Sequence, residues 1–335
     1  MKARHLASII FWPVVGLIAV LLSVGCQVEL TPQKINSGKQ AKINPGRFGL
    51  AATAVNDDVY IIGGSSSGGF VGKVEKYNIK SKTIVTLTKK LLSRRYHTAQ
   101  SFEEKIYIMG GAIAGPRFTQ IETNRVERYD PKSNEVKKLA PLPTPRSMPA
   151  SVIYNGKVYV IGGSIIKDIV QIDKIFFNER ETFYYTGTVE IYDIAANKWM
   201  RGNAKPTLSV CEAVLYNGKI YAIGGYNGLP QNTFEVYDIA TDRWEKLPDL
   251  PFTISAHHGA VLNGKIYTFG DYYDLNRVCQ YDFATKEWSI LSTNFNPSRL
   301  NAVVTCGDAI YIIGGTAASS NSWLDDIQVF RPVRL

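Results

Sequence analysis

One ten-residue phrase, in six variants, recurs along the chain. Its clearest copy is YNGKVYVIGG at residues 154–163. Asn-Gly is a strong signal for a two-residue hairpin turn, because both central positions of a type I′ turn need a positive φ. The β-branched and aromatic residues that follow favour a half-buried strand, and the Gly-Gly pair ends it where a side chain would not fit or where φ becomes positive. Each copy is therefore predicted to be part of an antiparallel hairpin.

The copies are spaced as structural repeats. The two glycines, or Gly-Asp in the fifth copy, fall at residues 63–64, 110–111, 162–163, 224–225, 270–271 and 314–315, so successive copies lie 44 to 62 residues apart. An aromatic residue ends a later apolar strand in every unit: Tyr77, Tyr129, Tyr192, Tyr237, Tyr281 and Phe330. Units three to five add a Trp seven residues later: Trp199, Trp244 and Trp288. Each unit is thus predicted to hold four short strands, A to D, separated by turn-forming residues.

One four-stranded sheet of this kind cannot bury both of its faces, so neighbouring sheets must stack, and stacking in a circle leaves only short, protected edges. The phased Gly-Gly, Tyr and Trp residues resemble kelch repeats, and the resemblance covers residues 47–330. It implies an all-β fold, a six-bladed β-propeller of four-stranded antiparallel blades. The chain departs from the pattern where Asp271 replaces a glycine, and in units one, two and six, which lack the Trp.

Closure of the circle can be predicted from the two ends of the repeat region. Unit six ends after its strand C at residues 326–332, and residues 33–44 have no partner in unit one. We therefore predict that a strand within residues 33–44 supplies the outer strand of the last blade. The expected domains are a leader at 1–26, a linker with the ring-closing strand at 27–46, and the propeller at 47–335.

The first 26 residues have the character of a targeting segment. Lys2 and Arg4 precede an uncharged stretch from Leu6 to Val24, as in a secretory signal. Cys26 follows Gly25, which resembles the lipobox of bacterial lipoproteins, whose Cys is lipidated, although Ser23 stands where that family usually has Leu. An uncleaved membrane anchor and ordinary secretion are the alternatives. All three place the folded domain outside the cytoplasm, in the periplasm, at the cell surface or secreted.

Charge and cysteine content exclude some classes of partner. The chain has 38 basic and 29 acidic residues, a net charge of +9, without a run of five basic residues, so no nucleic-acid partner is expected. Cys211, Cys279 and Cys306 lie in predicted strands at a spacing that suits no zinc site. We expect buried free thiols, with at most one disulfide.

The loops after the Gly-Gly pairs form the candidate binding face. In each unit the A–B and C–D turns share one face of the propeller, and the variable B–C loops share the other with the links between blades. The longest loop, residues 164–187 of unit three, carries the candidate ligand-binding residues Phe176, Tyr184 and Tyr185. It could form a lid or an aromatic wall over the central opening, or a hairpin that packs on its own blade.

Arginines recur at the start of strand A on the same face: Arg47, Arg94, Arg146 and Arg299. Four guanidiniums around one opening would favour an anionic ligand, because arginine offers a bidentate fork to carboxylates. Alternatively, each arginine pairs with backbone carbonyls or with a carboxylate of the next blade.

Catalytic patterns are sparse, and no cofactor or metal is expected. Kelch-type copper oxidases resembling galactose oxidase need two His, two Tyr and a Cys beside one Tyr. Here His97 lies three units from His257 and His258, and no Cys is predicted on a site-facing loop.

Two functions remain open. The first is a module that binds a protein or a glycan without catalysis. The second is an enzyme that resembles the bacterial kelch mutarotases that interconvert sialic acid anomers. Such an enzyme needs an acid or base for proton transfer and an Arg for the sugar carboxylate. Glu212, on strand A of unit four, and His258 are the weak catalytic candidates.

Overall fold

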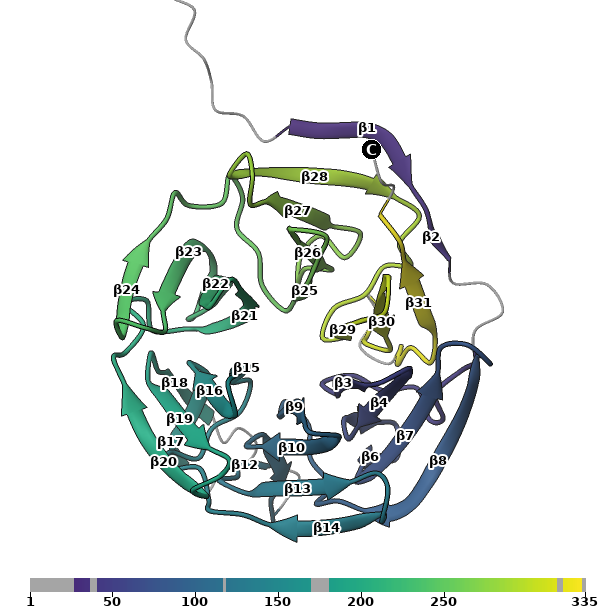
Figure 1. Cartoon of the computed structure of the whole chain (residues 1–335), viewed down its shortest axis with the longest axis vertical. Coiled ribbons are helices and arrows are strands. Elements are labelled where there is room, and N and C mark those ends of the chain that lie inside the picture. Colours follow the sequence, from purple (N-terminus) through teal and green to yellow (C-terminus); the bar gives the residue numbers. More distant parts are fainter. Residues whose placement is uncertain (1–26, 37–40, 117–118, 170–180, 318–321, 333–335) are drawn as a thin grey trace, which may run out of the picture.

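Six antiparallel sheets stand in a ring, as Figure 1 shows, so the predicted all-β propeller is confirmed. The computed structural model describes residues 27–36, 41–116, 119–169, 181–317 and 322–332. Within them, no helix is long and apolar enough to cross a membrane.

The strands of each blade follow one another from the centre of the ring outward. Blade one holds β3 (Ala51–Val55), β4 (Asp58–Ile62), β7 (Lys73–Asn78) and β8 (Thr83–Lys90), and blade two holds β9 (Thr98–Phe102), β10 (Lys105–Met109), β13 (Val126–Asp130) and β14 (Glu135–Lys138). Blade three holds β15 (Ala150–Tyr154), β16 (Lys157–Ile161), β19 (Val189–Asp193) and β20 (Lys198–Gly202), and blade four holds β21 (Val210–Tyr216), β22 (Lys219–Tyr226), β23 (Pro230–Asp238) and β24 (Arg243–Lys246). Blade five holds β25 (His258–Leu262), β26 (Lys265–Phe269), β27 (Val278–Asp282) and β28 (Glu287–Thr293), and blade six begins with β29 (Ala302–Cys306), β30 (Ala309–Ile313) and β31 (Ile327–Phe330).

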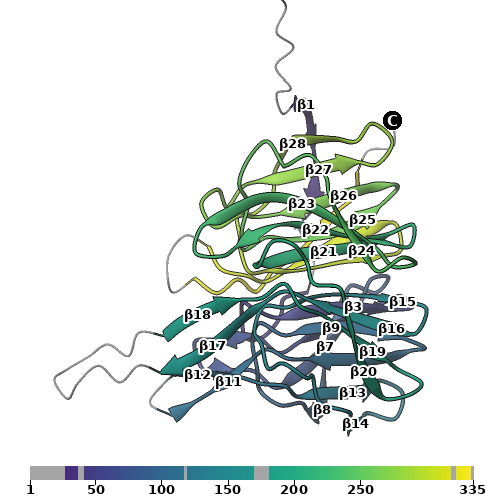
Figure 2. The same cartoon turned by 90° about the vertical axis from the view of Figure 1, so that its left-hand side faces the viewer.

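The B–C loops of the first three blades carry small hairpins of their own. These are β5 (Ser65–Ser66) with β6 (Gly69–Phe70), β11 (Ala112–Ala114) with β12 (Gln120–Glu122), and β17 (Ser164–Ile169) with β18 (Glu181–Tyr185). In Figure 2, β11, β12, β17 and β18 extend from the same side of the ring. We call this side the loop face.

An amino-terminal strand completes blade six, as predicted. β2 (Ile35–Asn36) pairs with β31, with Ile35 opposite Phe330, and forms the outer edge of that sheet. Both backbone polar groups of Ile35 bond to the side chain of Asn294, whose Nδ2 donates to the Ile35 carbonyl at 3.0 Å and whose Oδ1 accepts from the Ile35 amide. The strand β1 (Gln27–Gln33) was not predicted, and it adds to the outer edge of blade five, parallel to β28.

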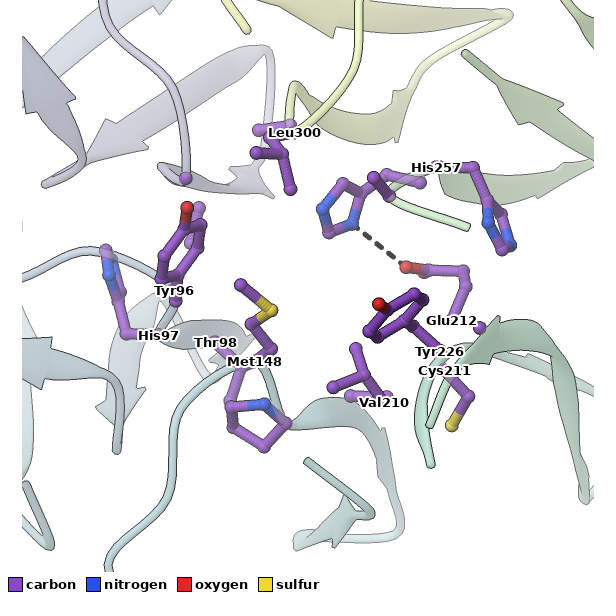
Figure 3. Close-up of a pocket in the computed structure, with 18 of the residues that line it drawn as sticks. Tyr96, His97, Thr98, Met148, Val210, Cys211, Glu212, Tyr226, His257 and Leu300 are labelled. Carbon is purple, nitrogen blue, oxygen red and sulfur yellow. Dashed lines mark hydrogen bonds and ion pairs between the residues drawn. The ribbon is translucent and has the colours of Figure 1, made fainter. Parts of the chain in front are cut away.

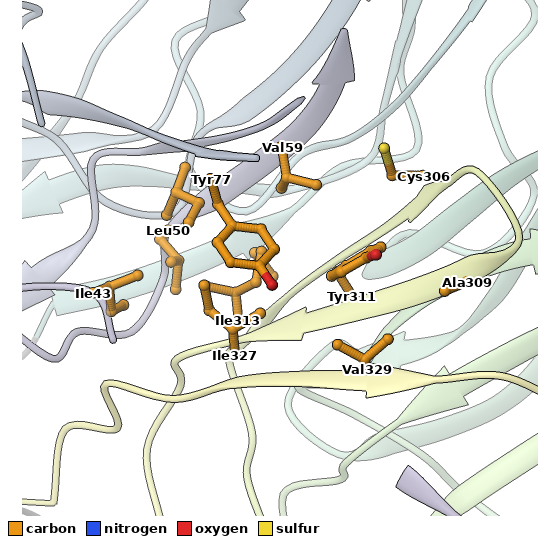
Figure 4. Packing of buried hydrophobic residues seen from close by; sticks show 12 residues of the cluster. Ile43, Leu50, Val59, Tyr77, Cys306, Ala309, Tyr311, Ile313, Ile327 and Val329 are labelled. Atoms are coloured by element: carbon orange, nitrogen blue, oxygen red, sulfur yellow. The ribbon is translucent and has the colours of Figure 1, made fainter. Parts of the chain in front are cut away.

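The hydrophobic core lies between the blades. Buried apolar residues form six clusters, each of which joins residues of two neighbouring blades. Figure 4 shows the cluster between blades six and one, where the rings of Tyr77 and Tyr311 lie 6.0 Å apart between centroids. The repeated Trp residues add a polar link, since Trp199 and Trp244 donate from Nε1 to the carbonyls of Ala140 and Asn203 in the preceding blade, each at 2.9 Å. No blade could bury these surfaces alone.

The Gly-Gly pair brings each blade against the next. The amide of the second glycine donates to a backbone carbonyl at the start of the following blade: Gly64 to Arg94, Gly111 to Arg146 and Gly315 to Arg47, each at 2.9 Å. A Cβ at Gly314 (φ 58°) would lie 2.6 Å from the Arg47 carbonyl oxygen. A Cβ at Gly315 (φ 101°) would lie 2.8 Å from the Arg299 carbonyl oxygen. Only glycine combines these torsion angles with such a close approach.

Candidate functional site

A cavity of about 580 Å³ opens at the centre of the ring. All six blades line it with residues at or near the start of their innermost strands: Leu50, Tyr96, Met148, Val210, His258 and Leu300. The B–C loops of blades three to five contribute Tyr185, Tyr226, Tyr272 and Tyr273. Since both sets of residues belong to the loop face, the cavity lies on the side that the variable loops indicated. Figure 3 shows many of its lining residues.

A chain of backbone hydrogen bonds runs around this cavity and is interrupted at blade four. Gly49, Tyr96, Met148, Ala256 and Leu300 are equivalent residues with positive φ. Each link runs from an amide to the equivalent carbonyl one blade earlier: Leu300 to Ala256 (2.9 Å), Gly49 to Leu300 (2.9 Å), Tyr96 to Gly49 (2.7 Å) and Met148 to Tyr96 (2.8 Å). The equivalent residue in blade four, Val210, instead lies in β21 and pairs with Tyr226. Among the described residues, no such bond links Val210 to Met148 or to Ala256.

The interruption coincides with the polar pair of the cavity. Glu212 of β21 and His258 of β25 both line it, and Glu212 Oε2 lies 2.9 Å from His258 Nδ1, the bond marked by the dashed line in Figure 3. The side chain of Glu212 is 15% exposed and that of His258 is 39% exposed. The structure therefore brings together, from adjacent blades, the two residues that the sequence offered as catalytic candidates. Their position alone assigns no reaction.

Two other histidines reach the cavity but are buried. Burial lowers the pKa of His97 to about 3, and the positive charge of Arg94 adds to this effect. Burial, followed by the nearby charge of His258, likewise lowers the pKa of His257 to about 3. Both imidazoles are therefore neutral at neutral pH and add no charge to the cavity.

The lowered pKa of His97 predicts a loss of stability in acid. The unfolded chain takes up a proton on His97 as the pH falls below about 6.5, whereas the folded chain does so only near pH 3, so stability decreases over this interval. By pH 5 the loss amounts to about 2 kcal/mol for this residue. His97→Asn should reduce the fall in unfolding free energy between pH 7 and pH 5 by that amount, as measured by urea denaturation. Asparagine is chosen because Asn301, fully buried, occupies the equivalent place in blade six.

Tyrosines surround the opening of the cavity. Tyr226 is 39% exposed, Tyr272 48% and Tyr273 75%. The rings of Tyr226 and Tyr185 meet edge to face with centroids 5.9 Å apart, which connects the B–C loops of blades three and four. We call Tyr185, Tyr226, Tyr272 and Tyr273 the tyrosine rim.

The tyrosine rim includes one of the three aromatic residues predicted in the blade-three loop. Tyr185 lines the cavity, whereas Tyr184, opposite Ile165 in the hairpin, is exposed but does not. Phe176 lies outside the described residues, as does Cys26.

The arginine prediction is corrected for three of its four residues. Arg47, Arg94 and Arg146 are buried and do not line the cavity. Each forms an ion pair with a glutamate of its own blade, two positions before the repeated Tyr: Arg47 with Glu75, Arg94 with Glu127, and Arg146 with Glu190. Each also donates to the carbonyl of the first glycine in its blade: Gly63 (2.8 Å), Gly110 (3.1 Å) and Gly162 (2.9 Å).

Burial lowers the pKa of each guanidinium, and the paired carboxylate opposes that shift. The alternative of structural pairing is therefore correct, although the carboxylate comes from the same blade rather than the next.

Arg299 differs because it stands one residue further along the repeat. Ser298, fully buried, occupies the place of Arg47, and Arg299 is only half-buried. Its guanidinium carbon lies 4.0 Å from the ring centroid of Tyr272, and its Nη1 donates to the Tyr272 carbonyl at 3.0 Å. Arg299 thus supports the tyrosine rim from behind without lining the cavity.

The sequence interpretation missed Tyr226, Tyr272 and Tyr273, but one signal for them was present. Asp271, noted only as a departure from Gly-Gly, is buried and organises the blade-five loop. Its Oδ1 accepts from the amides of Tyr272 (2.7 Å) and Ser255 (2.9 Å). The substitution that breaks the repeat therefore fixes the backbone at the tyrosine rim.

The cysteines are free and buried, as expected. Cys211 nevertheless lines the cavity, as do His97 and His257, because inner strands of distant blades meet at the centre of the ring. The separation of these residues along the sequence therefore did not predict how far apart they lie in the structure. Within the described residues, no group of three or more His, Cys, Asp or Glu side chains is placed to hold a metal ion.

Comparison with known proteins identifies the family. The family model described as KLHDC2/KLHL20/DRC7 Kelch-repeats domain matches residues 49–271. The chain belongs to the kelch-repeat family. Rat kelch-like protein 25 is 26% identical over 253 residues, which cover 64% of this chain and 43% of that protein. Zebrafish kelch repeat and BTB domain-containing protein 12 is 30% identical over 209 residues, 58% of this chain and 32% of that protein. The kelch chain thus spans less than half of the length of these two relatives.

A solved structure agrees with the fold. "Structure of YjhT" aligns with a TM-score of 0.72 at 16% sequence identity and covers 88% of this chain and 97% of that chain. At this level of identity the likeness concerns the fold alone.

Proposed function

We propose that this kelch propeller is a binding module that holds a partner, preferably a protein, at the tyrosine rim and the cavity behind it. The observation that supports the proposal is the group of exposed aromatic side chains around a concave opening, Tyr226, Tyr272 and Tyr273. Exposed apolar and aromatic groups that surround a cavity are typical of interaction sites, and tyrosine is enriched among residues that dominate binding energy. The variable loops of three blades supply the tyrosine rim, whereas the scaffold beneath them is repetitive.

The proposal is tested by removing the exposed rings. The variant Tyr226→Ser/Tyr272→Ser/Tyr273→Ser should reduce partner capture at least tenfold, because each lost anchor costs about 1–2 kcal/mol or more. Capture is measured by in-cell crosslinking followed by mass spectrometry, and a glycan array tests the alternative class of partner. The control Val85→Ser/Met200→Ser removes exposed apolar groups from the outer strands β8 and β20. Equal capture by the rim variant and the control would remove the proposal.

A sugar mutarotase is the second candidate, because Glu212 and His258 together supply an acid–base pair inside the cavity. The described lining residues include no arginine for a sugar carboxylate, and three of the arginines proposed for that role are committed to glutamates. Exchange of sialic acid anomers, followed by NMR at micromolar protein, tests this activity. An enhancement that disappears in Glu212→Gln would support the enzyme and argue against a purely binding role.

We further propose that the propeller works outside the cytoplasm, attached to a membrane through lipid on Cys26. The support is the sequence of residues 1–26 alone: a basic start, an uncharged stretch and a small residue before Cys26. Cells fed a radiolabelled fatty acid should label the wild-type chain and not Cys26→Ser. Label on both, or on neither, would contradict lipidation at this residue.

A further inference from the structure

We infer that the cavity receives a cationic group of the partner, a lysine or arginine side chain, with Glu212 as its counter-charge. This inference rests on the proposed binding function and specifies the chemistry of the partner. It also reverses the expectation of an anionic ligand.

The charges that face the cavity favour a cationic ligand. Among the described residues that line it there is no lysine or arginine, Glu212 is the one carboxylate, and the one basic side chain besides His97 and His257 is His258, the hydrogen-bond partner of Glu212. His97 and His257 are neutral at neutral pH, as shown above, and burial raises the pKa of the Cys211 thiol to about 11, so it too is uncharged. A negative charge in a concave, largely apolar site attracts cations and repels anions more strongly than it would in water.

The geometry of the Glu212 carboxylate leaves one of its oxygens open to a ligand. His258 Nδ1 lies 2.9 Å from Oε2 of Glu212 and thereby holds the side chain in place. The other oxygen, Oε1, has no hydrogen-bond partner among the described residues, and the group is partly exposed. An ammonium or guanidinium that reached this oxygen would form a charge-assisted bond, the stronger class of hydrogen bond.

The interruption at blade four offers an additional acceptor. In the chain of backbone bonds, the carbonyls of Gly49, Tyr96, Ala256 and Leu300 each accept the amide of the next blade. Met148, which precedes the interruption and lines the cavity, accepts no such bond from Val210. Among the described residues nothing donates to the Met148 carbonyl, which leaves it as an acceptor for a ligand with several N–H donors, as lysine and arginine have.

The tyrosine rim completes a site for a cation. The faces of aromatic rings attract cations, and the chain already shows this contact, since Arg299 stacks 4.0 Å from the centroid of Tyr272. Tyr226 and Tyr185 meet edge to face beside the cavity, and Tyr226 pairs with Val210, two residues before Glu212 in β21. A long basic side chain could thus pass the aromatic rings with its stem and place its charge at Glu212.

The test is selection from a phage-displayed library of random 12-residue peptides on the complete chain. We expect the selected peptides to be enriched in Lys or Arg. Fluorescence polarisation with one labelled selected peptide should show at least about tenfold weaker binding to Glu212→Gln, because a charge-assisted bond is lost. Replacing its basic residue by norleucine should have a comparable effect, and the second substitution should add little in Glu212→Gln.

A matched control separates this effect from a general change in charge. Glu135→Gln removes an exposed carboxylate from β14 and should bind the peptide like the wild type. Selection of acidic or neutral peptides, selection of none, or equal affinity in Glu212→Gln would overturn the inference. A partner that is lost in the rim variant but unaffected by Glu212→Gln would preserve the proposed binding function and remove only the cationic group. Thermal melting of both variants checks that they remain folded.

Discussion

Removal of residues 27–45 is expected to lower the free energy of unfolding by at least about 4 kcal/mol, because truncating one buried isoleucine alone costs about 2–5 kcal/mol. Two such side chains are lost: Ile35 is 1% exposed and Ile43 is 2% exposed. The outer strand of blade six disappears with them, as does the bond from the Ile43 amide to the Asp325 carbonyl (2.8 Å). The midpoint of thermal unfolding should fall by about 5 °C or more.

The measurement is urea and thermal denaturation of the chain beginning at residue 27 and of the chain beginning at residue 46. Asn294→Ala provides a milder version, because it removes only the two side-chain bonds to Ile35 and should cost about 1–2 kcal/mol. The shortened chain should also self-associate, since β31 becomes an unpaired edge. Equal stability of the two chains would show that the amino-terminal strand does not close the ring in solution.

Arg146→Ile should destabilise the protein by about 3–5 kcal/mol, because it leaves Glu190 buried without its counter-charge. The Arg146 Nη2 to Glu190 Oε2 distance is 2.7 Å, and both side chains are almost completely buried. After the substitution, the hydroxyl of Thr144, which donates to Glu190 Oε1 at 2.7 Å, would be the remaining side-chain bond. Chemical denaturation at neutral pH measures the loss.

Blade five supplies the control for this prediction. There Ile254 stands in place of the arginine and Cys279 in place of the glutamate, and both belong to one buried apolar cluster. The double variant Arg146→Ile/Glu190→Cys should therefore recover to within about 2 kcal/mol of the wild type, since replacing a whole buried ion pair by apolar groups is often close to neutral. If the double variant were as unstable as Arg146→Ile, the loss of stability would not come from the unpaired charge of Glu190.

The sequence could predict the fold because every unit repeats the same solution. Asn155-Gly156, the strand after it and the Gly-Gly pair all point to one hairpin, and six copies in phase specify the ring. The ring-closing strand was predictable because unit six lacks an outer strand. The parallel strand β1 was not, since its residues QVELTPQ carry no strong strand pattern, and its place depends on the free edge of β28.

The candidate site was less predictable, because it depends on register and on departures from the repeat. Arg299 takes the place of Ser147 rather than that of Arg146, and successive side chains of an extended segment point in opposite directions, so the two arginines have different environments. The glutamate partners were overlooked, although they recur two residues before the tyrosine in the first four units. Glu212 and His258 were selected separately, and they meet because they hold the same register position, opposite Ile223 and Phe269, in the innermost strands of adjacent blades.

Hydrogen–deuterium exchange of the complete chain, with and without the selected basic peptide, tests most directly whether the loop face of blades four and five is the binding site. We predict slower exchange in residues 208–212, 225–230, 254–258 and 271–274, which surround Glu212 and the tyrosine rim. Protection confined to the opposite face, at the hairpin turns 155–156, 217–218 and 263–264, would contradict this assignment.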